Sequence, residues 1–395
     1  MGFDSGTISF RRFAVVGEGP GSVDQNLLDQ LSAQAMRTGE LGVPEEVEYG
    51  WCGGRHLLDG DFSFEHNVFA DSLHFAMRVD TNRVPASLKR AYTMIEEEAA
   101  AKENPSGFIS KNQKRDAREI VRRKLEDELR SGRFRRSKMI PILWDLNSAT
   151  LCCNANGATL EQLMELFERT FGLTLMPLSA GAAMLRMLEK KARRRDYEDM
   201  RPTRFVHGPE GESQWPEYPW VLKGPEPKDF TGNEFVLWMW HEAEANGGTI
   251  STEAGEVSVM FDKWLDLDCS YGQTGRASLR ATGTSRMPEA RVGLRQGKVP
   301  RRAGLTIELA GLQFTFTLNA ETLAVGGATL PDVPEADTPR VLFEERIALL
   351  RELWRTTDAL LDAFAHVRCG SSWEGQTSSM RRWIAQGSKP VAAVA

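Results

Sequence analysis

The chain has 395 residues, of which 41% are hydrophobic and 26% are charged. These fractions are ordinary for a folded globular protein, and the length exceeds what one compact core usually holds, so we expect two to three domains. Lys and Arg number 49 against 55 Asp and Glu, a net charge of −6, and no apolar run reaches the roughly 18 residues that a membrane span needs. The composition therefore predicts no membrane partner, and it argues against a nucleic-acid partner unless basic residues are concentrated locally.

The first half of the sequence combines strands and helices without regular βαβ alternation, which predicts an α+β fold with mixed or antiparallel sheets and packing helices. Expected strands cover residues 6–17, 47–52, 72–80, 139–146, 149–155 and 173–177. Expected helices cover residues 23–36, 84–102, 111–131, 158–171 and 180–196. The consecutive helices 84–102 and 111–131 predict a protruding antiparallel helical hairpin.

The second half begins after residues 201–229, which hold six prolines with little periodicity and read as a linker or insertion at a domain boundary. A helix is expected at 229–245, followed by strands at 256–269, 276–283, 304–309, 312–318 and 322–325 and helices at 287–296 and 338–367. The predicted domains are a central α+β domain (1–84 and 138–200), a helical finger (85–137), the linker (201–229), a second α+β domain (230–370) and a frayed tail (371–395).

The helix expected at 111–131 has well-marked ends. Ser110 followed by Gln113 fits a capping box, and Gly132 stands where a left-handed C-terminal cap belongs. Residues 111–138 hold 12 Lys and Arg against 5 Asp and Glu, a net charge of +7 in a chain at −6. This local excess of positive charge is the main functional signal in the sequence.

Basic side chains follow one line along this helix, because Lys111, Arg115, Arg118 and Arg122 recur at helical spacing. Such a line can contact successive phosphates of a nucleic-acid backbone and release their counterions. The alternative is a solvated helix whose arginines pair with Glu119, Glu126, Asp127 and Glu128. The helix alone does not decide between the two.

The loop RFRRSK after this helix contains no acidic residue, so we expect its cations to be free for a partner. Residues 186–204 and 276–302 are also basic, with net charges of +4 and +7, which leaves the rest of the chain at −24. This segregation predicts a basic groove with acidic outer walls. The predicted DNA-binding residues are Lys111, Lys114, Arg115, Arg118, Arg122, Arg123, Arg133, Arg135, Arg136, Lys138, Arg291, Arg295, Lys298, Arg301 and Arg302.

An enzymatic reading has less support. The segment GEGPG at 17–21 lacks the full glycine spacing of a dinucleotide site, and no phosphate-binding lysine follows it. Four aspartates near strand ends leave open a metal-dependent DNA-processing enzyme, and they are Asp145, Asp262, Asp266 and Asp268. We expect no cofactor and no metal site.

The five cysteines are odd in number and scattered, at Cys52, Cys152, Cys153, Cys269 and Cys369. They form no CxxC pair, which argues against a disulfide framework and a structural zinc site and favours a reducing cytoplasm. The N-terminal residues lack the charged-then-apolar pattern of a secretory signal.

Several of these features together resemble the RdgC family of recombination-associated proteins. They are the Gly-Trp at 50–51 in a glycine-rich turn, the strand LHFAMRVD, Val-Pro before a helix, and the basic helix. More specific is the block RRSKMIPILWDLNSATLCCNANGATLEQLMELFERTFGLTLMPLS, with its apolar strand ending in Trp-Asp, a short return strand, a helix and a closing Leu-x-Pro-Leu-Ser. The resemblance covers about residues 7–190, and the Pro- and Trp-rich stretch near 205–230 departs from it.

The resemblance implies a non-enzymatic protein that binds duplex DNA with little sequence preference, as a ring-shaped homodimer that encircles it. It also implies that the protein restrains a RecA-type recombinase and is associated with the nucleoid. In this family a helical finger reaches the partner subunit, and hairpin 85–131 is the candidate here. Phe134 would match an aromatic residue that supports a dimer contact. The residues themselves leave open whether single-stranded DNA is also bound.

Overall fold

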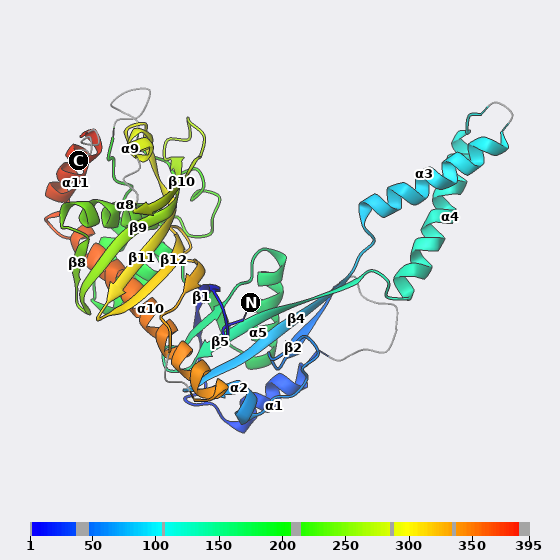
Figure 1. The fold of residues 1–395 in the computed structure, drawn as a ribbon, viewed down its shortest axis with the longest axis horizontal. Coiled ribbons are helices and arrows are strands. Elements are labelled where there is room, and N and C mark those ends of the chain that lie inside the picture. Colours follow the sequence, from blue (N-terminus) through cyan, green and yellow to red (C-terminus); the bar gives the residue numbers. More distant parts are fainter. Residues whose placement is uncertain are drawn as a thin grey trace. The chain divides into compact units, whose positions relative to one another are not determined.

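The computed structural model describes residues 2–36, 47–104, 107–206, 215–284, 288–333 and 337–386 (Figure 1). The chain forms two compact units. The finger unit comprises Gly17–Asn147 and Ala155–Thr174, and the main unit comprises Met1–Val16, Ser148–Asn154 and Leu175–Ala395. Both combine helices with antiparallel strands, which confirms the predicted α+β class.

The division into units differs from the predicted domains. Residues 201–229 lie inside the main unit and do not separate two units, so the expectation of a boundary there is wrong. The short N-terminal piece of the chain belongs with the C-terminal half because β1 (Ile8–Val16) pairs with β13 (Val325–Thr329). A pairing over more than 300 residues of sequence leaves no local signal.

The finger unit is built on a three-stranded antiparallel sheet in the order β5-β4-β2. Its elements are α1 (Gln25–Ala33), β2 (Val47–Cys52), α2 (Phe64–Asn67), β3 (Val68–Phe69), β4 (Ser72–Asn82), α3 (Ala86–Glu103), α4 (Lys111–Arg130), β5 (Arg135–Asp145) and α5 (Ala158–Phe171). All were expected except α2 and β3, which are too short to show periodicity.

Aromatic side chains fill the core between this sheet and α5. Trp51 lies 5.1 Å from Phe75 and Trp144 lies 5.2 Å from Phe167 between ring centroids, both edge-on. Such pairs add about 0.5–1.5 kcal/mol each beyond their buried area. The Trp51 indole N–H donates to the Thr170 hydroxyl at 2.8 Å, so the buried ring keeps its hydrogen bond. The Trp-Asp strand in the sequence therefore supplies a core tryptophan.

Helices α3 and α4 form the predicted hairpin, which continues from the ends of β4 and β5 (Figure 1). The capping box at Ser110 and Gln113 is present, and Gly132 has the left-handed φ of +74° that ends the helix. Asn82 at the end of β4 donates to the Leu129 carbonyl at 2.9 Å and fixes the root of the hairpin.

The main unit contains a sheet in the order β10-β9-β11-β12-β13-β1-β6, with β7 beside β1 and β8 beside β9. Its further elements are β6 (Thr150–Cys153), β7 (Thr174–Pro177), α6 (Ala180–Lys190), α7 (Arg194–Asp199), α8 (Phe230–Ala245), β8 (Thr249–Thr252), β9 (Gly255–Cys269), β10 (Ala277–Thr284), α9 (Pro288–Arg295), β11 (Lys298–Leu309), β12 (Leu312–Asn319), α10 (Pro339–Arg368) and α11 (Trp373–Ala385).

Helix α8 is buried over most of its length because apolar residues occur on all of its sides, and it packs on β8, β9 and β11. Gly232 permits a close approach at its start. A Cβ atom there would lie 1.8 Å from the Ala320 carbonyl oxygen, so no larger residue fits without a backbone shift.

Three expectations for the main unit need correction. The helix expected at 180–196 is two helices, because the chain turns at Ala192 with a left-handed φ of +56°. The strand expected at 322–325 lies instead at Val325–Thr329. The tail expected to fray contains α11, whose Met380 and Ile384 are buried. Among the helices that the structure describes, none is long and apolar enough to cross a membrane.

Candidate nucleic-acid interface

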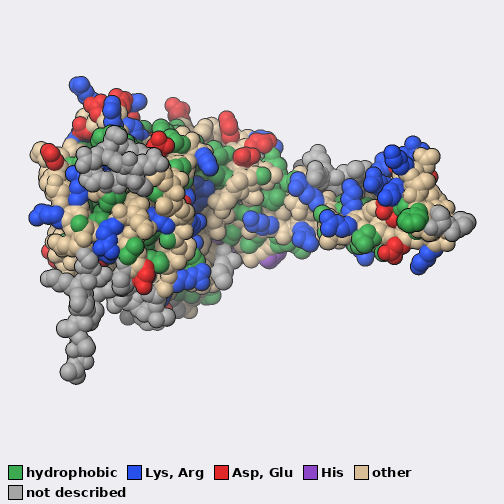
Figure 2. All heavy atoms as spheres, turned by 90° about the horizontal axis from the view of Figure 1, so that it is seen from above, with side chains coloured by type: hydrophobic (Ala, Val, Ile, Leu, Met, Phe, Trp, Pro, Cys, Tyr) green, Lys and Arg blue, Asp and Glu red, His purple; other side chains and the backbone are tan. Residues whose placement is uncertain are grey.

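The N-terminal half of α4 carries four exposed cations, Lys111, Lys114, Arg115 and Arg118. Within the described part of the chain, none of them forms an ion pair. Lys111, Arg115 and Arg118 share one line of the helix, as their spacing predicted. In Figure 2 Lys and Arg side chains gather along the hairpin. We call these four residues the tip cations.

Two of the tip cations, Lys111 and Lys114, lie in the first turn of α4, where the helix dipole disfavours positive charge. The N-terminal end of a helix carries a partial positive charge, so a cation in its first turn destabilises it by about 0.3–1 kcal/mol. Helix α4 has no acidic residue in its first turn to offset this. Helix stability therefore does not explain basic residues at this end.

Two arginines near the middle of α4 are paired with carboxylates of the same helix. Arg122 pairs with Glu119, and at 3.4 Å with Glu126. Arg123 also reaches Glu119, at 3.4 Å. The self-paired helix that the sequence left open thus describes Arg122 and Arg123, whereas the tip cations have no carboxylate partner among the described residues.

The loop RFRRSK is less free than its sequence predicts. Arg133 pairs with Glu128 at 3.0 Å, and Arg135 pairs with Asp80 at 2.7 Å and Glu48 at 3.2 Å. The expectation that all cations of this loop are unpaired is therefore wrong for these two. The carboxylates come from the preceding helix and from strands 55 and 87 residues away in sequence, where the loop composition gives no hint of them.

Asp80 anchors the root of the hairpin. Its side chain is 3% exposed and also accepts from the buried Arg78, at 2.6 Å. Burial alone would raise the pKa of Asp80, but hydrogen bonds from Arg78, Ser137 and Arg135 outweigh it and lower the pKa below its ordinary value. The carboxylate thus stays charged and holds Arg135 in place.

Arg136 and Lys138 are the free cations of β5. Both are exposed, and no ion pair to either occurs among the residues described. They lie two residues apart on one face of the strand, opposite Thr81 and Val79 of β4. Phe134, the predicted dimer contact, precedes them in the turn after α4 and is partly exposed.

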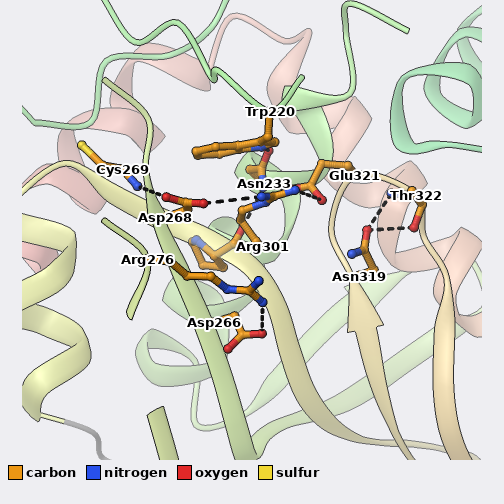
Figure 3. Close-up of polar contacts among 11 residues, drawn as sticks. Trp220, Asn233, Asp266, Asp268, Cys269, Arg276, Arg301, Asn319, Glu321 and Thr322 are labelled. Atoms are coloured by element: carbon orange, nitrogen blue, oxygen red, sulfur yellow. Dashed lines mark hydrogen bonds and ion pairs between the residues drawn. The ribbon is translucent and has the colours of Figure 1, made fainter. Parts of the chain in front are cut away.

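The predicted contacts in the main unit divide in the same way. Arg301 lies between Glu321, at 2.9 Å, and Asp268, at 3.4 Å, with the Trp220 ring centroid 4.7 Å from its guanidinium (Figure 3). Asn233 also donates to Glu321, at 2.8 Å, so this cluster ties α8 to the sheet. Arg301 therefore has a structural role.

Arg291 is similarly engaged, since it pairs with Glu244 and its guanidinium stacks 3.9 Å from the Trp383 ring centroid. Lys298 donates to the Gly275 carbonyl at 2.6 Å. Arg295 is exposed, and none of the described carboxylates pairs with it. Of the predicted contacts in this stretch, Arg295, Lys298 and Arg302 have no carboxylate partner among the described residues.

The strand-end aspartates do not converge on one site. Asp266 pairs with Arg276, Asp268 with Arg301, and Asp262 with Lys263 at 3.6 Å. Asp145 belongs to the finger unit. Over the described ranges, no group of three His, Cys, Asp or Glu side chains is placed to hold a metal ion. The positions of these aspartates give no support to the metal-dependent alternative.

Comparison with models of protein families finds none that matches this chain, and comparison with curated proteins finds no match either. The resemblance to the RdgC family accordingly stays a prediction from the motifs of the sequence. The functional assignment depends on the charges and surfaces described above.

Proposed function

We propose that this chain is a DNA-binding protein that contacts the phosphate backbone with little sequence preference. The observation that carries the proposal is the set of four tip cations, which have no acidic partner among the described residues, and two of which, Lys111 and Lys114, lie in the first turn of α4 against its dipole. A line of such cations suits a chain of phosphates, because each contact releases counterions whichever base is attached.

Arg136 and Lys138 would extend this contact at the root of the hairpin. Both are exposed and lie on the same face of β5. In the sequence they follow the tip cations after the rest of α4 and the turn that ends it. Arg122, Arg123, Arg133 and Arg135 would contribute less, since their charge is already met by carboxylates.

We further propose that the chain acts as a homodimer through its hairpin. The hairpin exposes four large apolar side chains, Phe108 at 81%, Ile95 at 58%, Met94 at 54% and Ile120 at 52%. Helix α3 contains no buried residue at all. Exposed apolar surface on a two-helix hairpin favours burial against a partner. The RdgC resemblance suggests that this partner is a second copy of the chain, with Phe134 at one of the contacts.

The same resemblance suggests that the dimer closes around duplex DNA as a ring and restrains a RecA-type recombinase. A protein with these properties would be nucleoid-associated in the cytoplasm. These finer statements depend on the family resemblance, whereas backbone binding depends on the cations themselves.

The proposal is tested by fluorescence anisotropy with two labelled duplexes of equal length and unrelated sequence, titrated between 50 and 200 mM salt. We expect equal affinities and a steep loss of affinity with salt. A single strand of the same length, included as a separate titration, shows which form is preferred. Affinity that differs tenfold between the duplexes, or does not change with salt, would overturn the proposal.

Two further measurements address the dimer and the enzymatic alternative. Analytical ultracentrifugation should give twice the chain mass. If the dimer is a closed ring, it should stay on closed circular DNA through a high-salt wash that releases the protein from linear DNA. Incubation of labelled duplex with Mg²⁺ or Mn²⁺ should leave it intact, because a backbone binder breaks no bond. Cleavage that depends on the aspartates of β9 would favour the enzyme instead.

A further inference from the structure

Trp264 of β9 holds two arginines that come from different strands. Arg280 of β10 lies directly opposite Trp264 in the sheet, and its guanidinium carbon is 4.2 Å from the ring centroid. Arg302 of β11 lies 4.8 Å from the same centroid. Because β10 and β11 flank β9 on opposite sides, the two guanidiniums approach the ring from both neighbouring strands. Each such contact is worth about 0.5–1 kcal/mol at an exposed site.

Neither of these two arginines pairs with a carboxylate that the structure describes. The nearby Arg276 and Arg301 are each neutralised by aspartate or glutamate. Contact with a ring face uses none of a guanidinium's N–H groups, so the donors of Arg280 and Arg302 stay available for an anion. The ring thus positions two charges without neutralising them.

The surface beside Arg302 carries a small residue and a hydroxyl group. Its guanidinium passes 3.5 Å from where a Cβ of Gly326 would lie, so a small residue leaves its edge open. Thr315 follows on the same face of β12 and is partly exposed, and its hydroxyl forms a 3.2 Å hydrogen bond with that of the buried Thr306 of β11. Hydroxyls and guanidinium forks are common partners of phosphate oxygens.

The nearest carboxylate does not compete for this position. Asp266 stands opposite Arg302 in the sheet, but its side chain is 1% exposed and pairs with Arg276. Burial alone would raise the pKa of Asp266, yet its polar contacts, the ion pair with Arg276 among them, outweigh it and lower the pKa. Asp266 therefore stays charged and held by Arg276.

We propose that Arg280, Trp264 and Arg302 form a second phosphate-binding site, on the sheet of the main unit, for the backbone of a nucleic acid. The inference rests on the proposed function and adds Trp264 and Arg280 to the predicted DNA-binding residues, Arg280 coming from the basic stretch 276–302. Both contacts to the ring are made by guanidiniums, whose N–H donors suit phosphate oxygens whichever base is attached. The site is thus expected to bind phosphate irrespective of base.

The first test measures duplex affinity of the full chain against salt for the variant R280Q/R302Q. Loss of two phosphate contacts should lower the slope of log K against log salt by about 2. Trp264→Leu, which keeps apolar bulk but removes the aromatic face, should weaken binding in the same direction. The matched control is R355Q in α10, which removes an exposed charge already paired with Glu352 at 2.8 Å and should leave the slope within about 0.5 of wild type.

The second test needs no variant. Arginine modification by phenylglyoxal, read by peptide mass spectrometry, should show Arg280 and Arg302 protected by duplex DNA and Arg276 unchanged. Protection by inorganic phosphate alone, at concentrations where DNA adds nothing, would identify a free phosphate ligand and overturn the nucleic-acid assignment.

The possible failures are distinguishable. If wild type binds DNA and the tip cations are needed, but R280Q/R302Q keeps the full slope and neither arginine is protected, the second site is wrong and the proposed function stands. If wild type binds no DNA, the proposed function fails and this assignment fails with it, while protection by phosphate would then mark a site for free phosphate only.

Discussion

Neutralising the tip cations separates their role in binding from any role in stability. The change is K111Q/K114Q/R115Q/R118Q, four substitutions at exposed positions that form no ion pair within the described chain. Glutamine keeps a long side chain and good helix propensity, so the hairpin should form as before. The variant alters charge at one end of α4 and little else.

Two magnitudes follow from the structure. Each lost phosphate contact lowers the slope of log K against log salt by about 0.9, so four contacts predict a decrease of about 3 to 4. Stability should move the other way, because removing Lys111 and Lys114 from the positive end of the helix relieves about 0.3–1 kcal/mol each. Weaker binding with unchanged or slightly higher thermal stability is the expected combination.

The assays are the salt-dependent anisotropy titration and a thermal melt followed by circular dichroism. The matched control is R122Q/R123Q, one turn further along the same helix, where both arginines already pair with Glu119. This control should change the slope by less than about 1 and lower stability by a few tenths of a kcal/mol. Equal slopes for the two variants, or a lower melting temperature for the tip variant, would refute the reasoning.

Three other predictions concern the main unit. Gly232→Ala should destabilise it by roughly 1–3 kcal/mol in denaturant titrations, because the new Cβ meets the Ala320 carbonyl oxygen at 1.8 Å. Arg301→Gln should cost about 2–4 kcal/mol in the same assay, since it leaves the buried Glu321 without its cation. Burial, strengthened by neighbouring carboxylates, raises the pKa of Asp229 to about 6. Its stabilising effect is therefore present below pH 4 and lost as pH rises through 6, so the melting temperature of Asp229→Asn should fall less than that of wild type between pH 4 and pH 7.

Local features of the fold could be read from the sequence. The ends of α4 follow from Ser110, Gln113 and Gly132, whose side chains and backbone preferences act within one helical turn. The helix at 158–171 was expected at the same residues, because its apolar spacing and flanking glycines are also local. Periodicity and capping therefore gave the elements of the hairpin and its neighbours.

The pairing of charges could not be read in the same way. Arg135 and Arg136 are adjacent in a loop without acidic residues, yet one meets Asp80 and Glu48 and the other stays exposed. Alternation in β5 sends their side chains to opposite faces, and only the register with β4 and β2 decides which face carries carboxylates. Register is a tertiary property, so the loop sequence alone overestimates its free charge.

The free cations of this chain are not explained by a shortage of acidic partners. Acidic residues outnumber basic ones, 55 to 49, and many arginines find a carboxylate in the fold. The tip cations and the pair on Trp264 are nevertheless left uncompensated, one set on a helix end that disfavours positive charge and the other on a ring that consumes no hydrogen-bond donor. A partner that brings its own negative charge would meet these cations, as the proposed function requires. A phosphate backbone meets that requirement at both places without any demand on base sequence.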